Sequence, residues 1–512
     1  MSRDPLLRAF DRLVARAPAT PLVVSPSHRV TAGDVDALAR AAAGALAAGA
    51  PDPHRPWRAA VPPRGEAVGL QAGNGPGFLA GLVALRRGGH PAVLLDRRTP
   101  ELERRRIAAE VGAHSVLVCR CPWAAGAADY HLDAVAPPPK GGPAGGPGDA
   151  APPAGTAVVK LSSGSTGAAR GIATTTEALL ADDLALTAAM GIRPDDRLLS
   201  TVPFSHSYGL SSLVLPALVR GTLLVLPDSD GPFGPLAAAA DAGATVFPTV
   251  PAYLAALVRL ADPPPLPPSL RLVMTAGALL PAETSARFCA GFGAPVHVFY
   301  GASETGGICY DREGGAAERG TVGEPIEGVA VELAPLDAGE PAAAGGAARV
   351  VVRGPALALA YLPPEPSRLG GGRFATDDLG AWRGGELALL GRLDDLINVK
   401  GKKVNPREVE RVLAGLPAVD EALVTATRPT AERGPRVRAV VACRPGSLTP
   451  QEVVAWCRRH LADHKVPRSV LLLEAVPRNE RGKVDRDALA AAARAAADAE
   501  PPARQGRARG PD

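Results

Sequence analysis

The sequence predicts an α/β fold in which a large N-terminal domain of α/β sheets is followed by a small α+β domain. The first observation is the length of 512 residues, which exceeds what one hydrophobic core usually serves. The second is that short apolar runs alternate with helical patterns, as is typical of largely parallel sheets. The third is that a separate α+β pattern begins near Gly391.

The elements of the first domain are predicted by periodicity and by helix caps. Residues 5–16 place apolar side chains on one side of a helix. Thr31, followed by Asp34, is a suitable N-cap for a helix that continues to Ala48. Another helix ends near Arg87, and residues 323–353 resemble short β segments. Strands are expected at residues 91–96, 116–119, 157–160, 223–226, 245–248, 272–275 and 296–300.

Composition sets the predicted domain limits. Residues 134–155 are almost entirely Pro, Gly and Ala, so we expect an exposed loop inside a domain that spans residues 1–391. A second domain is expected at 395–490, after a hinge at residues 392–394 that is implied by the family resemblance described below. In the second domain we expect helices at 406–413 and 450–461 and strands at 422–425 and 437–442. Residues 491–512 are predicted to be a disordered tail.

Charge and cysteine content argue against several classes of function. Lys and Arg total 56 against 52 for Asp and Glu, a net charge of +4 that does not indicate nucleic acid or an acidic membrane as partner. The six cysteines lack metal-ligand spacing and are expected to be free, mostly buried thiols. The sequence shows neither a signal-peptide pattern nor a membrane span, so we expect a cytoplasmic protein.

The strongest local signal is the segment at residues 161–171, LSSGSTGAARG. It follows a predicted strand and precedes a helical pattern that begins near Thr175. Between Ser162 and Gly167, two glycines and four hydroxyl residues could direct backbone N–H groups and hydroxyls at one polyphosphate. The loop is not a Walker A motif, because no Gly-Lys-Ser/Thr ends it. Taken alone, a loop of this composition is more often only a loop.

These residues resemble the phosphate loop of the adenylate-forming superfamily, which contains acyl-CoA and aryl-CoA ligases, adenylation domains of peptide synthetases and luciferases. In this chain Ala169 replaces the proline and Arg170 the lysine of the family loop. The planar fork of Arg170 makes contacts with phosphate that differ from those of lysine. The resemblance implies a catalytic role for Thr166 and ATP binding by Ser162, Ser163, Gly164, Ser165, Thr166, Gly167 and Arg170.

Two further segments resemble nucleotide-binding motifs of the superfamily. Residues 298–305, VFYGASET, are similar to the Tyr-Gly-x-Thr-Glu segment, which implies that Glu304 is catalytic and binds Mg²⁺. The same likeness implies that Tyr300 lies against the adenine and that Gly301 and Ser303 contact the nucleotide. A glycine-rich turn implies contacts to the adenine edge from Gly277 and Ala278.

The motifs around the expected hinge come next in the same order as in the superfamily. Residues 374–379 resemble the ribose-binding motif and imply that Asp378 binds the ribose, with Asp377 in place of a glycine. Residues 391–397 resemble the hinge motif, which implies that Arg392 contacts the nucleotide and Asp394 is the pivot. Asn398 stands where the motif has lysine, and Gly401 matches the glycine of the thiol tunnel.

The C-terminal motif supplies the candidate adenylation lysine. Residues 476–486, VPRNERGKVDR, resemble the signature Leu-Pro-Arg-Thr-x-x-Gly-Lys, which implies that Lys483 stabilises the reacting carboxylate and phosphoryl oxygens. The acid pocket is implied to include His206, Tyr208 and Ala302. A structural role for His206 stays open.

The resemblance, which covers the chain from about Phe10 to Leu489, implies a distorted β-barrel in the first domain and a mobile second domain. It also implies an AMP-forming acid–thiol ligase that uses ATP, Mg²⁺ and coenzyme A. Transfer to the phosphopantetheine arm of an acyl carrier protein is an alternative, because Lys400, Lys402 and Lys403 are either contacts for coenzyme A or a solvated turn. An inactive nucleotide-binding homologue is a third possibility, motivated by Arg170, Asp377 and Asn398. The sequence does not identify the acid.

Overall fold

The computed structural model describes residues 4–51, 59–121, 123, 126–135, 151–163, 169–228, 233–336, 348–365, 368–393, 397–399, 402–427, 436–461, 463–478, 484–485, 488–489 and 491–492. The chain divides into two compact units. Unit 1 comprises Met1–Ala334, Val350–Thr376 and Trp382–Leu389, and unit 2 comprises Pro335–Arg349, Asp377–Ala381 and Leu390–Asp512. The predicted fold class, a large N-terminal α/β part with a small C-terminal part, is confirmed. The predicted domain limits at residues 391 and 395 stay predictions.

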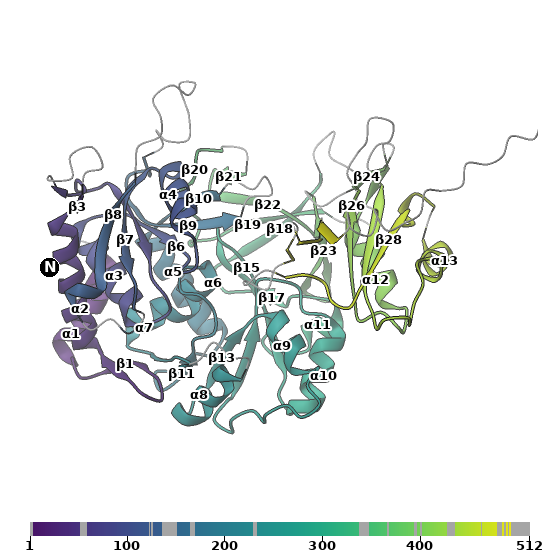
Figure 1. The fold of residues 1–512 in the computed structure, drawn as a ribbon, viewed down its shortest axis with the longest axis horizontal. Coiled ribbons are helices and arrows are strands. Elements are labelled where there is room, and N and C mark those ends of the chain that lie inside the picture. The colour runs from purple at the N-terminus through teal and green to yellow at the C-terminus, as the bar shows by residue number, and fades with distance from the viewer. Residues whose placement is uncertain are drawn as a thin grey trace, which may run out of the picture. The chain divides into compact units, whose positions relative to one another are not determined.

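A nine-stranded sheet lies in unit 1 (Figure 1). Its interior strands run parallel, and β2, β16 and β17 at the two edges are antiparallel to their neighbours. Parallel strands buried on both faces read as continuous apolar runs, which is why the sequence predicted the strands at 223–226, 245–248, 272–275 and 296–300. The short strands Pro21–Val24 and Arg197–Leu199 were not predicted. In sheet order the strands are β17 (Glu324–Pro325), β16 (Gly306–Tyr310), β15 (Val296–Ala302), β14 (Leu272–Thr275), β13 (Val246–Thr249), β11 (Arg197–Leu199), β12 (Leu223–Val225), β1 (Pro21–Val24) and β2 (Arg29–Thr31).

A seven-stranded sheet also belongs to unit 1. Strands β9, β6, β5 and β7 are parallel, and β10, β20 and β8 are antiparallel to their neighbours. In sheet order the strands are β20 (Ala360–Leu362), β10 (Ala169–Thr175), β9 (Thr156–Ser163), β6 (Ala92–Leu95), β5 (Ala67–Gln71), β7 (Ala113–Cys119) and β8 (Tyr130–Ala134). The sequence missed β10, which lies between the predicted phosphate loop and the next helix.

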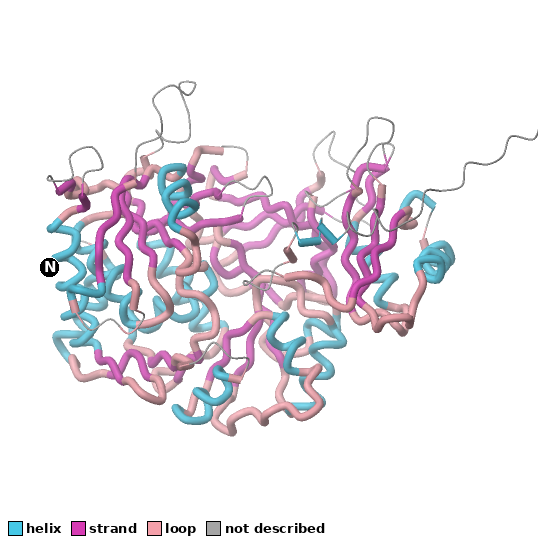
Figure 2. Tube along the Cα trace, viewed as in Figure 1, coloured by secondary structure: helices cyan, strands magenta, loops and turns pink. Residues whose placement is uncertain are grey.

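Helices alternate with the strands of unit 1, as Figure 2 shows by colour. The predicted cap at Thr31 is confirmed, because its side chain and that of Asp34 each accept the other residue's backbone N–H. The helices are α1 (Pro5–Arg16), α2 (Ala32–Ala48), α3 (Pro76–Gly88), α4 (Glu101–Glu110), α5 (Thr176–Ala189), α6 (Ser207–Gly209), the π-helical turn η3 (Leu210–Val214), α7 (Leu215–Arg220), α8 (Gly234–Ala242), α9 (Pro251–Leu257), α10 (Ala282–Phe292) and α11 (Ala316–Arg319).

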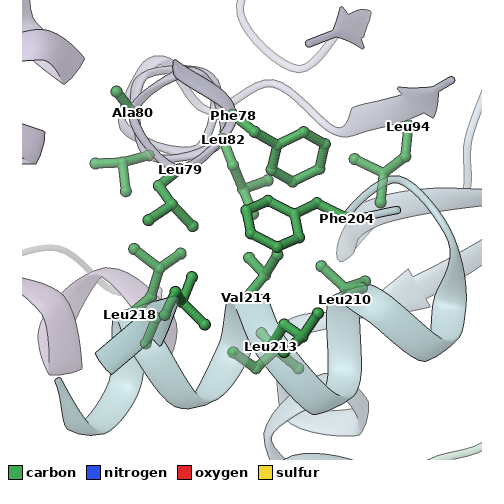
Figure 3. Close-up of a cluster of buried hydrophobic side chains, with 14 of the residues drawn as sticks. Phe78, Leu79, Ala80, Leu82, Leu94, Phe204, Leu210, Leu213, Val214 and Leu218 are labelled. Carbon is green, nitrogen blue, oxygen red and sulfur yellow. The ribbon is translucent and has the colours of Figure 1, made fainter. Parts of the chain in front are cut away.

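The hydrophobic core next to α3 holds residues 202–204 in place, just before the predicted site residue His206. Figure 3 shows side chains of α3 and of the 210–218 helical stretch meeting around Phe204. The rings of Phe78 and Phe204 meet edge to face with centroids 5.7 Å apart, and both are fully buried. The backbone N–H of Phe204 donates to Asn74 Oδ1 at 2.8 Å, and Asn74 Nδ2 donates to the carbonyl of Val202 at 2.8 Å. The chain entering His206 is therefore held by packing and by hydrogen bonds.

A five-stranded sheet follows, in which β18 (Ala330–Ala334), β19 (Ala348–Arg353), β22 (Arg373–Arg383) and β21 (Leu369–Gly370) pair in that order. Strand β23 (Glu386–Arg392) pairs with β22. Closure of these strands into the expected distorted barrel stays a prediction.

Unit 2 has its own small core. A three-stranded sheet in the order β26 (Glu421–Ala426), β27 (Val437–Ala442) and β28 (Ser469–Leu473) accompanies α12 (Pro406–Ala414) and α13 (Pro450–His460). A hairpin of β24 (Ile397–Val399) and β25 (Lys402–Val404) precedes them. Val409, Leu413 and Val424 are among the residues that form the core.

The described residues contain no helix with the length and apolar composition that a membrane crossing requires. All six cysteines are free thiols, and four of them are buried. Within the same described ranges, no group of three or more His, Cys, Asp and Glu side chains could hold a metal ion.

Candidate active site

Several predicted site residues follow the carboxyl ends of parallel strands in the nine-stranded sheet. His206 comes after β11, the exposed Gly277 and Ala278 follow β14, and Tyr300 and Gly301 lie at the end of β15. The register pairs Thr249 with Thr275 and Thr275 with Val298, so these strands end at the same edge. In open α/β sheets, ligands bind outside this edge. Residues far apart in the sequence are thereby brought to one side of the sheet.

Two side-chain contacts join this edge to the seven-stranded sheet. His206 Nε2 lies 3.4 Å from Oδ2 of Asp96, which follows β6. The hydroxyl of Tyr361, in β20, donates to Glu304 Oε1 at 2.8 Å. Both sheets therefore contribute to one candidate site within unit 1.

Only the flanks of the predicted phosphate loop belong to the described residues. Ser162 pairs with Arg170 and Ser163 with Ala169 across the antiparallel β9–β10 ladder. Gly164, Ser165, Thr166 and Gly167 lie outside the described residues. The segment therefore joins two antiparallel strands rather than opening directly onto a helix N-terminus.

Arg170, the departure from the family lysine, is engaged by two neighbours. Its Nη2 lies 2.7 Å from Glu365 Oε2, and its guanidinium carbon lies 5.1 Å from the ring centroid of Tyr361. The planar guanidinium can make both contacts at once, which a lysine ammonium could not do in the same way. Glu365 and Tyr361 therefore provide contacts that suit an arginine at position 170.

The turn that carries Glu304 is fixed on several sides. Its carbonyl accepts the N–H of Ala358 at 2.8 Å, and the preceding Ser303 accepts a hydrogen bond from the Ser207 hydroxyl at 2.6 Å. After it, the N–H of Gly307 donates to Oδ1 of the buried Asp182 at 2.8 Å. The half-buried carboxylate of Glu304 is therefore held in place by its surroundings.

Asp182, in α5, was not predicted, yet it organises this turn. Its Oδ2 accepts the hydroxyl of Ser211 at 2.5 Å, and its carboxylate approaches Gly306 so closely that a Cβ there would lie 2.3 Å from it. Gly306 also has a φ of +69°, a conformation that favours glycine. Both properties explain why glycine follows Thr305.

A buried lysine faces the same carboxylates. Lys160, in β9, is 2% exposed, and burial lowers its pKa while Asp182 and Glu304 oppose that shift. Burial raises the pKa of Asp182, and its bonds to Ser211 and Gly307 and the charge of Lys160 oppose that rise. Burial thus favours the neutral form of both groups, and the opposite charge of each group limits that shift in the other. A charged residue within the apolar run 157–161 was the sequence signal that could have identified this cluster.

We expect Asp182→Asn to lower the free energy of unfolding by about 1–3 kcal/mol, because it removes the charge beside Lys160 and one acceptor of the buried pair. The urea midpoint measures this change. Asp195→Asn is the matched control, since Asp195 is exposed and its substitution should fall within about 0.5 kcal/mol of wild type. Equal midpoints for the two variants would contradict the structural role of Asp182.

Tyr208 and Ala302, which are expected near the carboxylic acid substrate, are partly buried. The hydroxyl of Tyr208 donates to the carbonyl of Met274 at 3.4 Å, and its ring lies 5.7 Å from that of Phe299. Burial raises the pKa of Tyr208, so it stays neutral. Ala302 is half-buried at the end of β15. The roles of His206, Tyr208 and Ala302 toward an acid stay predictions.

The predicted ribose and hinge residues belong to unit 2. Arg392 Nη1 lies 3.3 Å from Asp378 Oδ1, and its Nη2 lies 3.6 Å from Asp377 Oδ2. The added charge of Asp377 is thus balanced by Arg392, which offers a reason why aspartate is tolerated in the place of glycine. Asp394, Gly401 and Lys483 lie outside the described residues.

Comparison with known proteins decides the family. The profile of the AMP-binding enzyme family matches residues 10–362, and that of the AMP-binding enzyme C-terminal domain matches residues 408–483. The chain belongs to the AMP-binding enzyme family. The adenylate-forming resemblance is thereby confirmed.

Individual curated proteins resemble the chain at moderate identity. A 2-succinylbenzoate–CoA ligase from Bacillus cereus is 30% identical over 335 residues, 63% of this chain and 67% of the relative. An oxalate–CoA ligase from Arabidopsis thaliana is 30% identical over 338 residues, 63% of this chain and 65% of the relative. The matches thus span about two thirds of the length of these curated relatives.

A solved structure matches more of the chain. The amide bond synthetase McbA from Marinactinospora thermotolerans superposes with a TM-score of 0.73 and 26% identity. The alignment covers 95% of this chain and 99% of McbA. The similarity in fold therefore extends over most of this chain.

Proposed function

We propose that this protein activates a carboxylic acid with ATP to form an acyl-adenylate and pyrophosphate, and then transfers the acyl group to coenzyme A. The observation that carries the proposal is the hydrogen bond between Tyr361 and Glu304. Tyr361 pairs with Ile172, two residues after Arg170, so this bond brings the strand after the predicted phosphate loop close to the candidate magnesium ligand. A triphosphate between these groups would meet hydroxyls, a cation and a carboxylate.

The first step requires charge stabilisation rather than a covalent intermediate with the protein. A carboxylate oxygen of the acid attacks the α-phosphorus, and pyrophosphate leaves. We propose three sets of nucleotide contacts. The phosphates would be held by Ser162, Ser163, Gly164, Ser165, Thr166, Gly167 and Arg170, and the adenosine side by Tyr300, Gly301, Ser303, Gly277 and Ala278. The nucleotide site would be completed by Asp378 and Arg392. Lys483 would stabilise the oxygens that gain charge in the transition state.

A divalent ion suits the chemistry of Glu304. One carboxylate with phosphate oxygens and water is a common set of ligands for Mg²⁺. When bound, Mg²⁺ neutralises phosphate charge, and Glu304 would supply the protein oxygen.

The second step exchanges AMP for a thiol. The sulfur attacks the carbonyl of the mixed anhydride, a thioester forms, and AMP leaves with the bond electrons. We propose that rotation about Asp394 withdraws Lys483 and brings Gly401 to the thiol path, a hinge motion between half-reactions.

Restricting this hinge should separate the two steps. Asp394→Pro fixes φ, so we expect thioester formation from supplied acyl-adenylate to fall at least about tenfold while pyrophosphate release changes less. Single-turnover assays of the two half-reactions measure the difference. Equal effects on both steps would contradict the hinge role.

The acceptor needs its own test. The CoA ligases among the relatives support coenzyme A, and the 26% identity to the amide bond synthetase McbA makes an amine the second candidate. Acyl-adenylate formed in place should be offered coenzyme A, a phosphopantetheinylated carrier protein and simple amines in parallel. A CoA thioester as the main product supports the proposal, and an amide or acylated carrier as the main product would replace it.

ATP–pyrophosphate exchange across a panel of carboxylic acids tests the activity itself. Acid-dependent exchange is expected for at least one aromatic, dicarboxylic or medium-chain acid. Nucleotide binding without exchange for any acid in the panel would favour the inactive homologue. We keep the cytoplasm as the predicted compartment.

A further inference from the structure

Tyr361 connects two parts of the candidate site that lie far apart in the sequence. It stands in β20, which pairs with β10 in the antiparallel sense, and its side chain is buried. Its hydroxyl donates to Glu304 Oε1 at 2.8 Å. Its ring is in contact with the Arg170 guanidinium, whose carbon lies 5.1 Å from the ring centroid. No predicted motif contained this residue.

The direction of the hydrogen bond follows from the two groups. The phenol O–H of Tyr361 donates, and a carboxylate oxygen of Glu304 accepts. A donor held on one carboxylate oxygen restricts the rotation of the carboxylate and thereby the direction of its other oxygen.

The ring of Tyr361 is restrained in turn. Arg170 is anchored by Glu365 at 2.7 Å, and Glu365 lies four residues beyond Tyr361 in the chain. The guanidinium is thus held against the aromatic ring by an ion pair on one side and attraction to the ring on the other. These contacts place the hydroxyl relative to Glu304.

We propose that Tyr361 is a positioning residue that orients the Glu304 carboxylate for the magnesium-bound triphosphate. The inference rests on the proposed function and adds to it a residue that acts through Glu304 without touching the nucleotide. Groups that orient a metal ligand from behind typically contribute 10- to 100-fold to metal affinity or activity. The effect of losing the hydroxyl should therefore depend on the metal.

Tyr361→Phe tests this dependence, since it removes the hydroxyl and keeps the ring beneath Arg170. Calorimetry with the non-reacting analogue α,β-methylene-ATP gives the affinity with Mg²⁺ and with EDTA. We expect the gain in affinity on adding Mg²⁺ to fall roughly tenfold, while the affinity in EDTA stays within about twofold of wild type. Acid-dependent exchange should need a correspondingly higher Mg²⁺ concentration for half-maximal rate.

Tyr130→Phe is the matched control. Tyr130 is also buried, and its hydroxyl donates to the carbonyl of Gly77 at 3.1 Å, away from the candidate site. We expect Tyr130→Phe to lower the melting temperature about as much as Tyr361→Phe does. Its affinity for the analogue should still rise on adding Mg²⁺ by the full wild-type factor. A Tyr361→Phe variant with the wild-type gain, or with equal losses in Mg²⁺ and EDTA, would show a merely structural role and overturn the proposal.

A double-variant cycle asks whether Tyr361 acts through Glu304. In a Glu304→Gln background, Tyr361→Phe should have no further effect on the metal-dependent gain. A second, additive loss would mean that Tyr361 acts by another route. A wild-type protein that binds the analogue but shows no acid-dependent exchange would refute the proposed function and leave the positioning test intact.

Discussion

Replacing Lys483 by Ala is expected to lower the rate of acyl-adenylate formation about 10²- to 10³-fold, as does the loss of one donor that stabilises transition-state charge. The ammonium is proposed to act only while the α-phosphorus is attacked. Thioester formation from supplied acyl-adenylate should therefore stay within a few-fold of wild type. Acid-dependent pyrophosphate release and thioester yield from chemically prepared acyl-adenylate measure the two steps separately.

The control for Lys483 removes a positive charge elsewhere in unit 2. Arg444 is exposed, and Arg444→Ala should leave both half-reactions within about twofold of wild type, as expected for a surface substitution. If Lys483→Ala slows both half-reactions by the same factor, the adenylation role is wrong. That outcome would indicate a general loss of the active conformation.

Glu304→Gln is expected to lower adenylation by about 10²-fold or more, because a neutral amide binds Mg²⁺ poorly and the metal supplies several kcal/mol of charge stabilisation. The substitution keeps the shape of the side chain and an oxygen that can accept the Tyr361 hydroxyl. Exchange assays over a range of Mg²⁺ concentrations should show that excess metal does not restore the wild-type rate.

Glu313→Gln makes the same chemical change at an exposed position and should be nearly silent. A Glu304→Gln enzyme whose exchange rate stays within threefold of wild type would rule out Glu304 as the essential metal ligand. The melting temperature of each variant shows whether a lost rate reflects a lost fold.

Helices and strands were predicted well where a helix cap or an apolar run within a few residues defines them. The helix Ala32–Ala48 begins at its predicted cap, and the strands Leu272–Thr275 and Val437–Ala442 coincide with apolar runs identified in the sequence. These features depend on period, capping and composition within a few residues. The order of the motifs also indicated the family before any contact was known.

The strand that follows the predicted phosphate loop, Ala169–Thr175, escaped prediction for a physical reason. Residues 169–175 mix alanine, arginine and glycine with isoleucine and threonine, so they show neither a strict alternation nor a continuous apolar run. They become a strand because β9 on one side and β20 on the other supply backbone partners. Backbone pairing with the two neighbouring strands therefore outweighed the weak strand propensity of residues 169–175.

By itself, the sequence predicted the α/β class, the helix Pro5–Arg16 and the cap at Thr31, because each depends on a pattern within a short segment. Only the tertiary structure decided that Tyr361 reaches Glu304, that Asp182 fixes the turn behind it and that Asp96 meets His206. Such contacts join residues 57 to 125 positions apart, and their geometry follows from how the sheets pack rather than from any local pattern.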